Sequence, residues 1–182
     1  NFVKVEKSYG GLKNATIPKY FTPELASLCG YVIGDGHVHK NGYRINAYVN
    51  EEETDLIEQL TWLWKVTFNI EPRYFVTNQN PQVKTIEDRN GLLRQIISTQ
   101  KVHNIEINSK QVASCLFPLA SKRVPQQIFQ SPNAVVAKFL AWLFEADGCA
   151  FGNGRGRTAI QLKSVTNGLL KDVQLLLLYF GS

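Results

Sequence analysis

Two aspartates, Asp35 and Asp147, each close a stretch of apolar and small residues: LCGYVIGDG at 28–36 and LAWLFEADG at 140–148. If both stretches are helices that pack side by side in the same direction, their C-terminal ends bring the two carboxylates close together. Two carboxylates beside the free carbonyls of two helix ends repel each other. A divalent cation such as Mg²⁺, which binds carboxylate, carbonyl, water and phosphate oxygens, relieves that repulsion. The pattern therefore favours metal-dependent phosphodiester hydrolysis.

An ordinary helix end is the alternative interpretation of a single Asp-Gly. The order of elements argues against it, because it recurs about Asp35 and Asp147, which stand 112 residues apart. Thr22-Pro23 and Ser131-Pro132 each resemble a helix start, with Thr22 or Ser131 as the N-cap. Each predicted helix is then followed by a hairpin and an amphipathic helix.

Turn and capping residues predict the elements between these points. Gly36 ends the first helix as a residue that can take positive φ, and Asn41-Gly42 is the turn of a hairpin over residues 37–49. Helical periodicity continues through residues 51–68. The remaining predictions are strand with turns at 73–91, a short helix at 92–99, a strand at 101–109, a helix at 110–120 that Pro118 stops, a hairpin at 149–164 and a helix at 166–181.

Small residues predict how closely the two Asp-Gly helices approach. Gly30 and Gly34 lie on one face of the first helix, and Ala137 and Ala141 are spaced in the same way on the second. Trp142 stands where the first copy has Gly30, and its bulk hinders close packing unless the glycines of the first helix leave room for it.

The two stretches resemble the motifs of LAGLIDADG homing endonucleases of the DOD type, the double-motif group embedded in inteins. Two further blocks strengthen the resemblance: a Lys-x-x-Pro block at Lys122–Pro125, and the tail NGLLKDVQLLLLYFG at 167–181. The resemblance covers residues 18–181 and implies an α+β fold. In that fold two pseudo-symmetric αββαββα repeats pack through their motif helices, and their antiparallel sheets form a saddle over DNA. We divide the chain into a lead-in segment at 1–21, a first repeat at 22–121, and the connecting block with a truncated second repeat at 122–182.

The same resemblance implies a function: Mg²⁺-dependent cleavage of both strands of a long duplex DNA site. It implies that Asp35 and Asp147 hold the metal with help from the carbonyls of Gly34 and Ala146, and that Lys122 is a basic catalytic residue near the scissile phosphate. Two alternatives stay open, an inactive DNA- or RNA-binding relic of maturase type and a structural insert of a split intein.

Polar residues of the two hairpins alternate with apolar ones and are the candidate DNA contacts, since a β-ribbon fits the major groove. They are Arg44, Asn46 and Tyr48 in the first hairpin, and Arg155, Arg157, Gln161 and Lys163 in the second. The acidic cluster Glu51, Glu52, Glu53, Asp55 and Glu58 is expected on a face turned away from phosphate. The net charge of +5 and the pI of about 9.1 agree with an acidic partner such as duplex DNA.

Further features bear on the chain's context. No stretch of 18 apolar residues predicts a membrane span, and the three cysteines lack any CxxC spacing and resemble core residues of an intracellular, reducing compartment. That compartment is the cytoplasm, or the nucleus or an organelle. The chain contains no Met, which suggests a piece of a longer product. Because the second copy stops after its second helix, we expect a C-terminal fragment or flanking splicing segments as partners.

Overall fold

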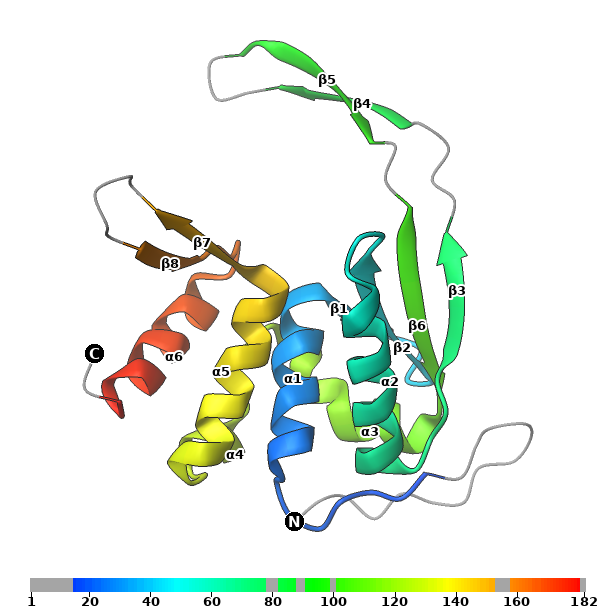
Figure 1. Ribbon diagram of the computed structural model, residues 1–182, viewed down its shortest axis with the longest axis vertical. Coiled ribbons are helices and arrows are strands. Elements are labelled where there is room, and N and C mark those ends of the chain that lie inside the picture. Colours follow the sequence, from blue (N-terminus) through cyan, green and yellow to red (C-terminus); the bar gives the residue numbers. More distant parts are fainter. Residues whose placement is uncertain (1–14, 78–81, 88–90, 99–100, 153–157, 181–182) are drawn as a thin grey trace.

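The computed structural model describes residues 15–77, 82–87, 91–98, 101–152 and 158–180. Figure 1 shows how the elements are arranged. The helices are α1 (Pro23–Asp35), α2 (Thr54–Phe68), α3 (Lys110–Leu116), the 3₁₀ helix η1 (Phe117–Ser121), α4 (Gln126–Phe129), α5 (Asn133–Asp147) and α6 (Asn167–Leu178). The strands are β1 (Gly36–Val38), β2 (Arg44–Asn50), β3 (Arg73–Thr77), β4 (Gln82–Glu87), β5 (Leu93–Ser98), β6 (Val102–Asn108), β7 (Gly148–Gly152) and β8 (Thr158–Leu162). Within the described ranges, no helix is long and apolar enough to cross a membrane.

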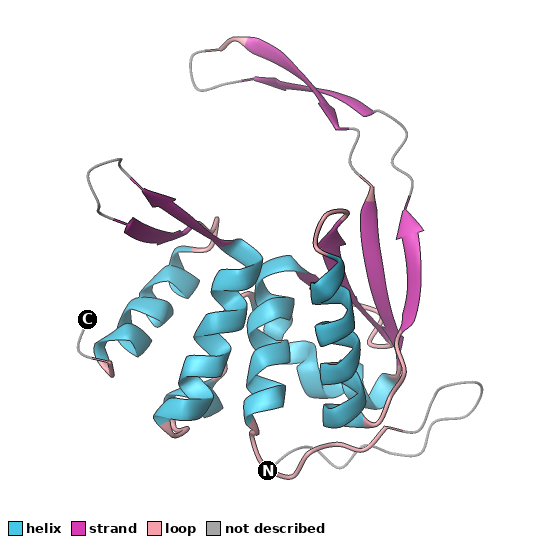
Figure 2. Ribbon diagram, viewed as in Figure 1, coloured by secondary structure: helices cyan, strands magenta, loops and turns pink. Residues whose placement is uncertain are grey.

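The fold is mixed α and β with antiparallel sheets, as predicted (Figure 2). A four-stranded sheet has the order β1-β2-β6-β3, and the hairpins β4–β5 and β7–β8 each form a two-stranded sheet. The elements α1, β1, β2, α2, β3, β6 and α3 therefore follow the predicted αββαββα order, with β4–β5 inserted as an arm between β3 and β6. In the strand register, Ile45 faces Ile107 and Ala47 faces Ile105, so one face of the sheet is apolar.

Helix α1 lies in the middle of the core, and every residue from Leu25 to Ile33 is buried. The predicted start is confirmed, because the Thr22 hydroxyl accepts a hydrogen bond from the Leu25 amide at 3.2 Å. The Tyr31 hydroxyl donates to the Tyr48 carbonyl at 2.7 Å and so ties α1 to β2. The predicted Asn41-Gly42 turn is also confirmed, with Gly42 at φ +71° between the paired strands β1 and β2.

One predicted helix is wrong. Residues 92–99 were expected to be helical, but β5 (Leu93–Ser98) pairs with β4 along its whole length, from Leu93 opposite Glu87 to Ser98 opposite Gln82. Gly91, at φ +76°, precedes the strand. The β-branched pair Ile96-Ile97 suits a strand better than a helix, and pairing with β4 supplies the partner that a short stretch cannot reveal alone.

Two smaller predictions also fail. Ser131 does not cap α5, because its hydroxyl donates to the Gln127 carbonyl of α4 at 2.8 Å and Pro132 takes the N-cap position instead. Of the three cysteines only Cys29 is buried in the core, whereas Cys115 is half-buried and Cys149 is exposed on β7.

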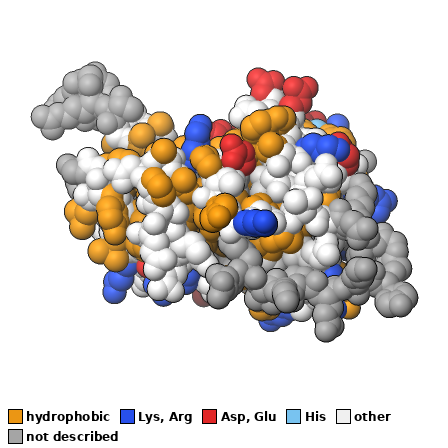
Figure 3. All heavy atoms as spheres, turned by 90° about the horizontal axis from the view of Figure 1, so that it is seen from below, with side chains coloured by type: hydrophobic (Ala, Val, Ile, Leu, Met, Phe, Trp, Pro, Cys, Tyr) orange, Lys and Arg blue, Asp and Glu red, His pale blue; other side chains and the backbone are white. Residues whose placement is uncertain are grey.

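Helix α6 leaves an apolar surface open to solvent. Figure 3 shows hydrophobic side chains gathered on the side of the molecule where α6 lies. The exposed large hydrophobic side chains of this described stretch are Leu175, Leu178, Tyr179 and Phe180. A groove runs along this surface of α6 and is lined by Lys171, Gln174, Leu175, Leu177 and Leu178.

Candidate active site at the ends of two helices

The two motif helices pack side by side and in parallel, and their C-terminal ends are their upper ends in Figure 1. A Cβ atom placed on Gly30 would lie 2.3 Å from the Phe139 carbonyl oxygen, and one on Gly34 would lie 2.4 Å from the Ala146 Cβ. At Gly30 the obstacle is the backbone of α5, so only glycine fits there, whereas at Gly34 the obstacle is the methyl group of Ala146. The close packing predicted from Gly30 and Gly34 is therefore confirmed.

The face of α5 that meets α1 differs from the one predicted. Ala137 and Ala141 are exposed, whereas Phe139, Leu143 and Ala146 meet the glycines of α1. A shift of two residues corresponds to about 200° around a helix, so the spacing of the two alanines identified the wrong side. The large apolar residues had to be on the buried face, and this decided the rotation of the helix.

Asp35 and Asp147 are the last residues of α1 and α5, and the packing brings their carboxylates together. The Cγ of Asp147 lies 3.5 Å from the position that a Cβ on Gly34 would occupy. Gly36 and Gly148 then turn the chain directly into strands β1 and β7. A Cβ there would lie 2.7 Å from the Val32 carbonyl oxygen and 2.2 Å from that of Phe144.

The sequence suggested that Gly36 is needed for a positive φ, and this reason is wrong. Gly36 has φ −114° and Gly148 has φ −85°, so neither takes positive φ. Each glycine is needed because the chain passes close to the last turn of its own helix, where a side chain would clash with backbone.

Burial at the helix ends raises the pKa of both carboxyl groups above the ordinary value for aspartate. Desolvation, followed by the charges of Asp147 and Glu53, raises the pKa of Asp35 to about 6. The Asp35 side chain is open to solvent on one side, but the ends of the two helices surround the other. Desolvation also raises the pKa of Asp147, and Lys122 opposes that shift.

Lys122 reaches this site from the connecting block. Its backbone takes the left-handed conformation at φ 52°, and its ammonium group donates to carbonyls at the end of α1. The acceptors are those of Val32 at 3.4 Å, Ile33, Gly34 at 3.1 Å and Gly36 at 3.2 Å. Burial lowers the pKa of Lys122, while Asp147 and Asp35 act in the opposite direction. The ammonium group thus neutralises the negative end of α1 beside both carboxylates.

The same block carries a second cation that sequence reasoning missed. Arg123 binds the buried Asp172 of α6 with two hydrogen bonds, of 2.6 Å from Nε and 2.7 Å from Nη2. The Val124 amide donates to the same carboxylate at 3.2 Å. Gly168 leaves room for the guanidinium, since a Cβ there would lie 2.9 Å from the Arg123 Cδ. Adjacent residues therefore attach the block to α1 through Lys122 and to α6 through Arg123.

The donor atoms at the helix ends suit a hard divalent cation. Asp35 and Asp147 supply carboxylate oxygens, and the carbonyl of Gly34 is already directed at a cation, the ammonium of Lys122. A cleft of about 460 Å³ opens at this point, lined among others by Gly34, Lys122, Asp147 and Lys163. Among the described residues no three His, Cys, Asp or Glu side chains converge on one metal position. Further ligands would thus be carbonyl, water or phosphate oxygens, which Mg²⁺ favours.

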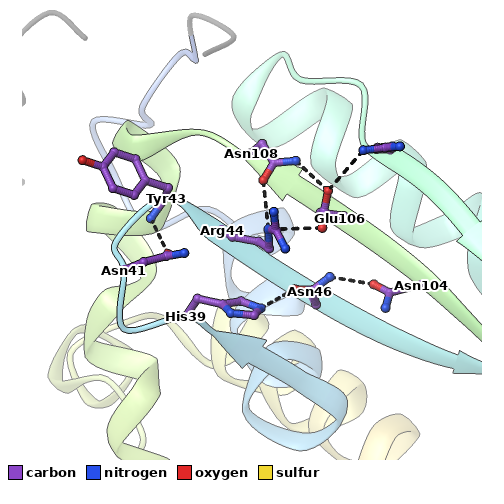
Figure 4. A network of polar contacts seen from close by, with 9 residues as sticks. His39, Asn41, Tyr43, Arg44, Asn46, Asn104, Glu106 and Asn108 are labelled. Carbon is purple, nitrogen blue, oxygen red and sulfur yellow. Dashed lines mark hydrogen bonds and ion pairs between the residues drawn. The ribbon is translucent and has the colours of Figure 1, made fainter. Parts of the chain in front are cut away.

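The polar face of the four-stranded sheet holds the first set of predicted DNA contacts (Figure 4). Arg44 and Tyr48 are exposed, but Asn46 is only 4% exposed. Asn46 donates to Asn104 at 2.7 Å and its Oδ1 contacts the His39 ring at 2.5 Å. Asn46 shares the sheet face with Arg44 and Tyr48, but unlike them it is buried, and neighbours on β6 and beside β1 occupy its hydrogen-bonding groups.

The second set belongs to the hairpin β7–β8. Gln161 and Lys163 are exposed, and Lys163 also lines the cleft beside Asp147. The predicted contacts Arg155 and Arg157 lie outside the described residues.

Sequence reasoning also missed one acidic residue, Glu106, and misplaced another, Glu53. Glu106 lies on the polar sheet face between Arg44 and Arg73, and only the alternation in HNIEIN at 103–108 gave a signal for it. Glu53 was expected to lie away from the phosphate site with the rest of its cluster. It acts on Asp35 instead, because the N-terminus of α2 lies near the C-terminus of α1.

Comparisons with known proteins agree with this geometry. A family model described as a LAGLIDADG-like domain matches residues 22–113 and 134–182. Glutamine–fructose-6-phosphate aminotransferase [isomerizing] of Methanocaldococcus jannaschii is 26% identical over 164 residues, which are 90% of this chain and 13% of that protein. The ribonucleoside-diphosphate reductase NrdEB subunit alpha of Bacillus subtilis is 28% identical over 175 residues, 90% of this chain and 15% of that protein, and so is its counterpart in Bacillus phage SPbeta. The chain therefore spans about one seventh of the relatives it matches.

Proposed function

Because the chain belongs to the family of LAGLIDADG-like domains, we propose that it is a homing endonuclease that cuts both strands of a long duplex DNA site in a Mg²⁺-dependent reaction. The observation that carries the proposal is the meeting of Asp35 and Asp147 at the ends of two parallel helices. Carboxylates that are partly desolvated and close together gain from binding a cation, and the raised pKa of Asp35 reflects first its desolvation and then the charge of Asp147. A purely structural helix contact has no need of two such groups at one end.

In the proposed reaction the residues of the chain have distinct tasks. Asp35 and Asp147, with the carbonyls of Gly34 and Ala146, would hold Mg²⁺, which when bound supplies a Lewis acid to the scissile phosphate and acidifies a water. Lys122 keeps a positive charge beside the carboxylates and would stabilise negative charge on the phosphate. The cleft that contains Lys122 and Asp147 is open towards the β7–β8 hairpin, where Lys163 offers a further cation.

Duplex DNA is the proposed partner, with the exposed polar side chains of the sheets as its contacts. In Figure 1 the β7–β8 hairpin and the β4–β5 arm both extend beyond the ends of α1 and α5 where the aspartates lie. Duplex bound between them would pass over the aspartates. This partner also implies a location inside the cell, where DNA is.

The relatives support an origin in an intein. Their printed names describe an aminotransferase and a reductase, which share no reaction, yet both contain a stretch similar to nearly all of this chain. A segment that recurs in unrelated enzymes, and makes up about one seventh of each, is better explained by a function of its own. We propose that this chain is the endonuclease part of such an insert.

A further polypeptide segment is the proposed partner of the second repeat. In the first repeat β2 pairs with both β1 and β6, whereas within the described residues β8 pairs with β7 alone. The exposed apolar side chains of α6 lie in the same half of the molecule. A segment that adds strands to β8 and covers α6 would complete the repeat in the manner of β3, β6 and α3.

Cleavage of DNA in which the two flanks of the insert are joined tests the function. The protein, with any segment that completes it, is incubated with this DNA and Mg²⁺ beside Asp35→Asn and Asp147→Asn. Asp55→Asn, at an exposed aspartate on α2, is the matched control. We expect a cut at the junction that Asp35→Asn and Asp147→Asn lose and the control keeps. Salt-dependent binding without any cut would contradict the nuclease and favour the inactive relic, and neither binding nor cleavage would favour the structural insert.

A further inference from the structure

A buried carboxylate, that of Glu106, stands in the middle of the polar sheet face (Figure 4). Its side chain is only 6% exposed. The strand register places Glu106 opposite Asn46 on β2 and opposite Arg73 on β3. Burying an unpaired charge is costly, so a buried carboxylate is kept only where donors surround it. The donors here come from β2, β3 and β6.

Three side chains hold the Glu106 carboxylate. Asn108 donates to its Oε1 at 2.6 Å, the Arg44 Nε lies 3.2 Å from its Oε2, and the Arg73 Nη1 lies 4.0 Å from its Oε1. Arg44 and Asn108 are also joined directly, because the Arg44 Nε donates to the Asn108 Oδ1 at 3.2 Å. Glu106, Asn108 and Arg44 therefore form a closed triangle of contacts.

The triangle holds the Arg44 guanidinium by one edge. Both of its contacts within the described residues use Nε, and the side chain is 46% exposed. A guanidinium is planar and rigid, so fixing Nε also fixes the direction of the two terminal nitrogens. Those nitrogens carry four N–H groups that remain available to a ligand.

Neighbouring groups on this face are already occupied. Asn46 is hydrogen bonded to Asn104 and His39, so its amide cannot bind a base without breaking those bonds. Arg73 is more exposed, with 75% of its side chain open to solvent, its Nη1 4.0 Å from Glu106 and its guanidinium 5.9 Å from the centre of the Phe75 ring. Arg44 is thus the cation whose direction this face fixes most firmly.

We propose that Glu106 is a positioning residue that directs the guanidinium of Arg44 at a guanine in the major groove, and so sets base specificity at one position of the target. This inference rests on the proposed binding of duplex DNA. The two terminal nitrogens of an arginine match the O6 and N7 acceptors of guanine. A well-oriented pair of this kind discriminates against other bases by roughly 5- to 150-fold. Without Glu106, Arg44 keeps its charge but loses its fixed direction.

Selection from a duplex library with a randomised core tests this inference. The 182-residue chain and its variants Glu106→Gln and Arg44→Lys are each equilibrated with the library, and bound DNA is sequenced. Glu52→Gln, the same substitution at an exposed glutamate, is the matched control. We expect the wild type to require G·C at one position. Arg44→Lys and Glu106→Gln should both reduce that preference, by up to the factor given above, and leave the other positions unchanged.

The outcomes separate the inference from the function on which it rests. A Glu106→Gln protein that keeps the wild-type preference, or that weakens binding equally at all positions, would overturn the positioning role while leaving DNA binding intact. A wild-type protein that selects no sequence and binds without salt dependence would overturn both. If Glu106→Gln does not fold, as judged by circular dichroism, Asn108→Ala takes its place. It removes the amide that joins Glu106 to Arg44, and the same local loss is expected.

Discussion

The close contact between Gly34 and Ala146 allows a quantitative test of the helix packing that brings the carboxylates of Asp35 and Asp147 together. A methyl group added by Gly34→Ala would lie 2.4 Å from the Ala146 Cβ, about 1 Å inside ordinary contact. Overpacking of this kind costs about 1–3 kcal/mol. For a chain of this length that corresponds to a fall in Tm of roughly 2–12 °C, less any gain from the better helix propensity of alanine.

Ala146→Gly supplies the compensating change. It removes the atom with which the new methyl group collides, and the next neighbours of that methyl group, the Asp147 Cγ and N, lie at 3.5 Å, which is ordinary contact. In the double variant one helix gains an alanine and the other loses one, so the propensity difference of about 1 kcal/mol cancels. We therefore expect the double variant to unfold near the wild-type temperature, with a coupling of about 1–3 kcal/mol between the two sites.

Thermal unfolding of the four proteins measures this coupling, and Gly30→Ala is the control. Its methyl group would meet the Phe139 carbonyl oxygen at 2.3 Å, a backbone atom that no truncation removes, so Ala146→Gly should not rescue it. Moving the helices apart by about 1 Å also displaces Asp35 from Asp147, and such a misplacement can cost about 100-fold in rate. A Gly34→Ala protein that unfolds at the wild-type temperature, or whose loss simply adds to that of Ala146→Gly, would refute the packing described here.

Three further predictions concern charge. Asp35→Asn should raise Tm at pH 7.5 in the absence of metal. Folding raises the pKa of Asp35 from 3.8 to about 6, so protonation of Asp35 stabilises the wild-type fold below about pH 4. That contribution is lost as the pH rises through about 6, where the variant then has the higher Tm. Thermal unfolding against pH measures the gain, and a gap that persists at pH 3 would contradict it. Lys122→Met should raise the pKa of Asp35 above about 6, since Lys122 lowers it, and an unchanged titration of Asp35 by NMR would count against this. The same variant should lower the free energy of unfolding by about 1–3 kcal/mol, because carbonyls at the end of α1 lose the Lys122 donor. Asp172→Asn should lower Tm at pH 7, because its pKa lies below the ordinary value through its bonds to Arg123. That loss should vanish as the pH falls through the lowered pKa, where the wild type loses the same interaction, and a pH-independent difference would exclude the ion pair as its cause.

The features that sequence predicted correctly depend on contacts within a few residues. Thr22 caps α1 through the amide of Leu25, three positions later, and Gly42 takes the positive φ that a tight hairpin demands. The glycine spacing of α1 also marks one face within a short stretch, although the residues of α5 that pack on that face lie more than 100 positions away. In each case the residues that carry the prediction lie in one short stretch.

The features that sequence missed depend on distant partners. Residues 92–99 gave no sign that β4 would pair with them, and the side of α5 that meets α1 was set by large residues elsewhere on that helix. Lys122 was expected near the site, but its four carbonyl acceptors follow from a left-handed backbone at a position where nothing in the sequence requires it. Glu106 escaped notice because its partner Arg44 lies 62 positions away, on a strand whose pairing with β6 appears only in the folded chain.

Trp142 explains why the second motif can depart from the first. It stands where Gly30 stands in α1, and a large residue there was expected to hinder the approach of the helices. In the structure its ring lies 6.0 Å from that of Tyr31, edge to face, at the margin of the contact. A close crossing requires only one of the two facing residues to lack a side chain, and Gly30 meets that requirement against the backbone of α5. Glycines on α1 alone therefore suffice to bring Asp35 and Asp147 together, which leaves α5 free to carry Trp142 and Ala146 in their place.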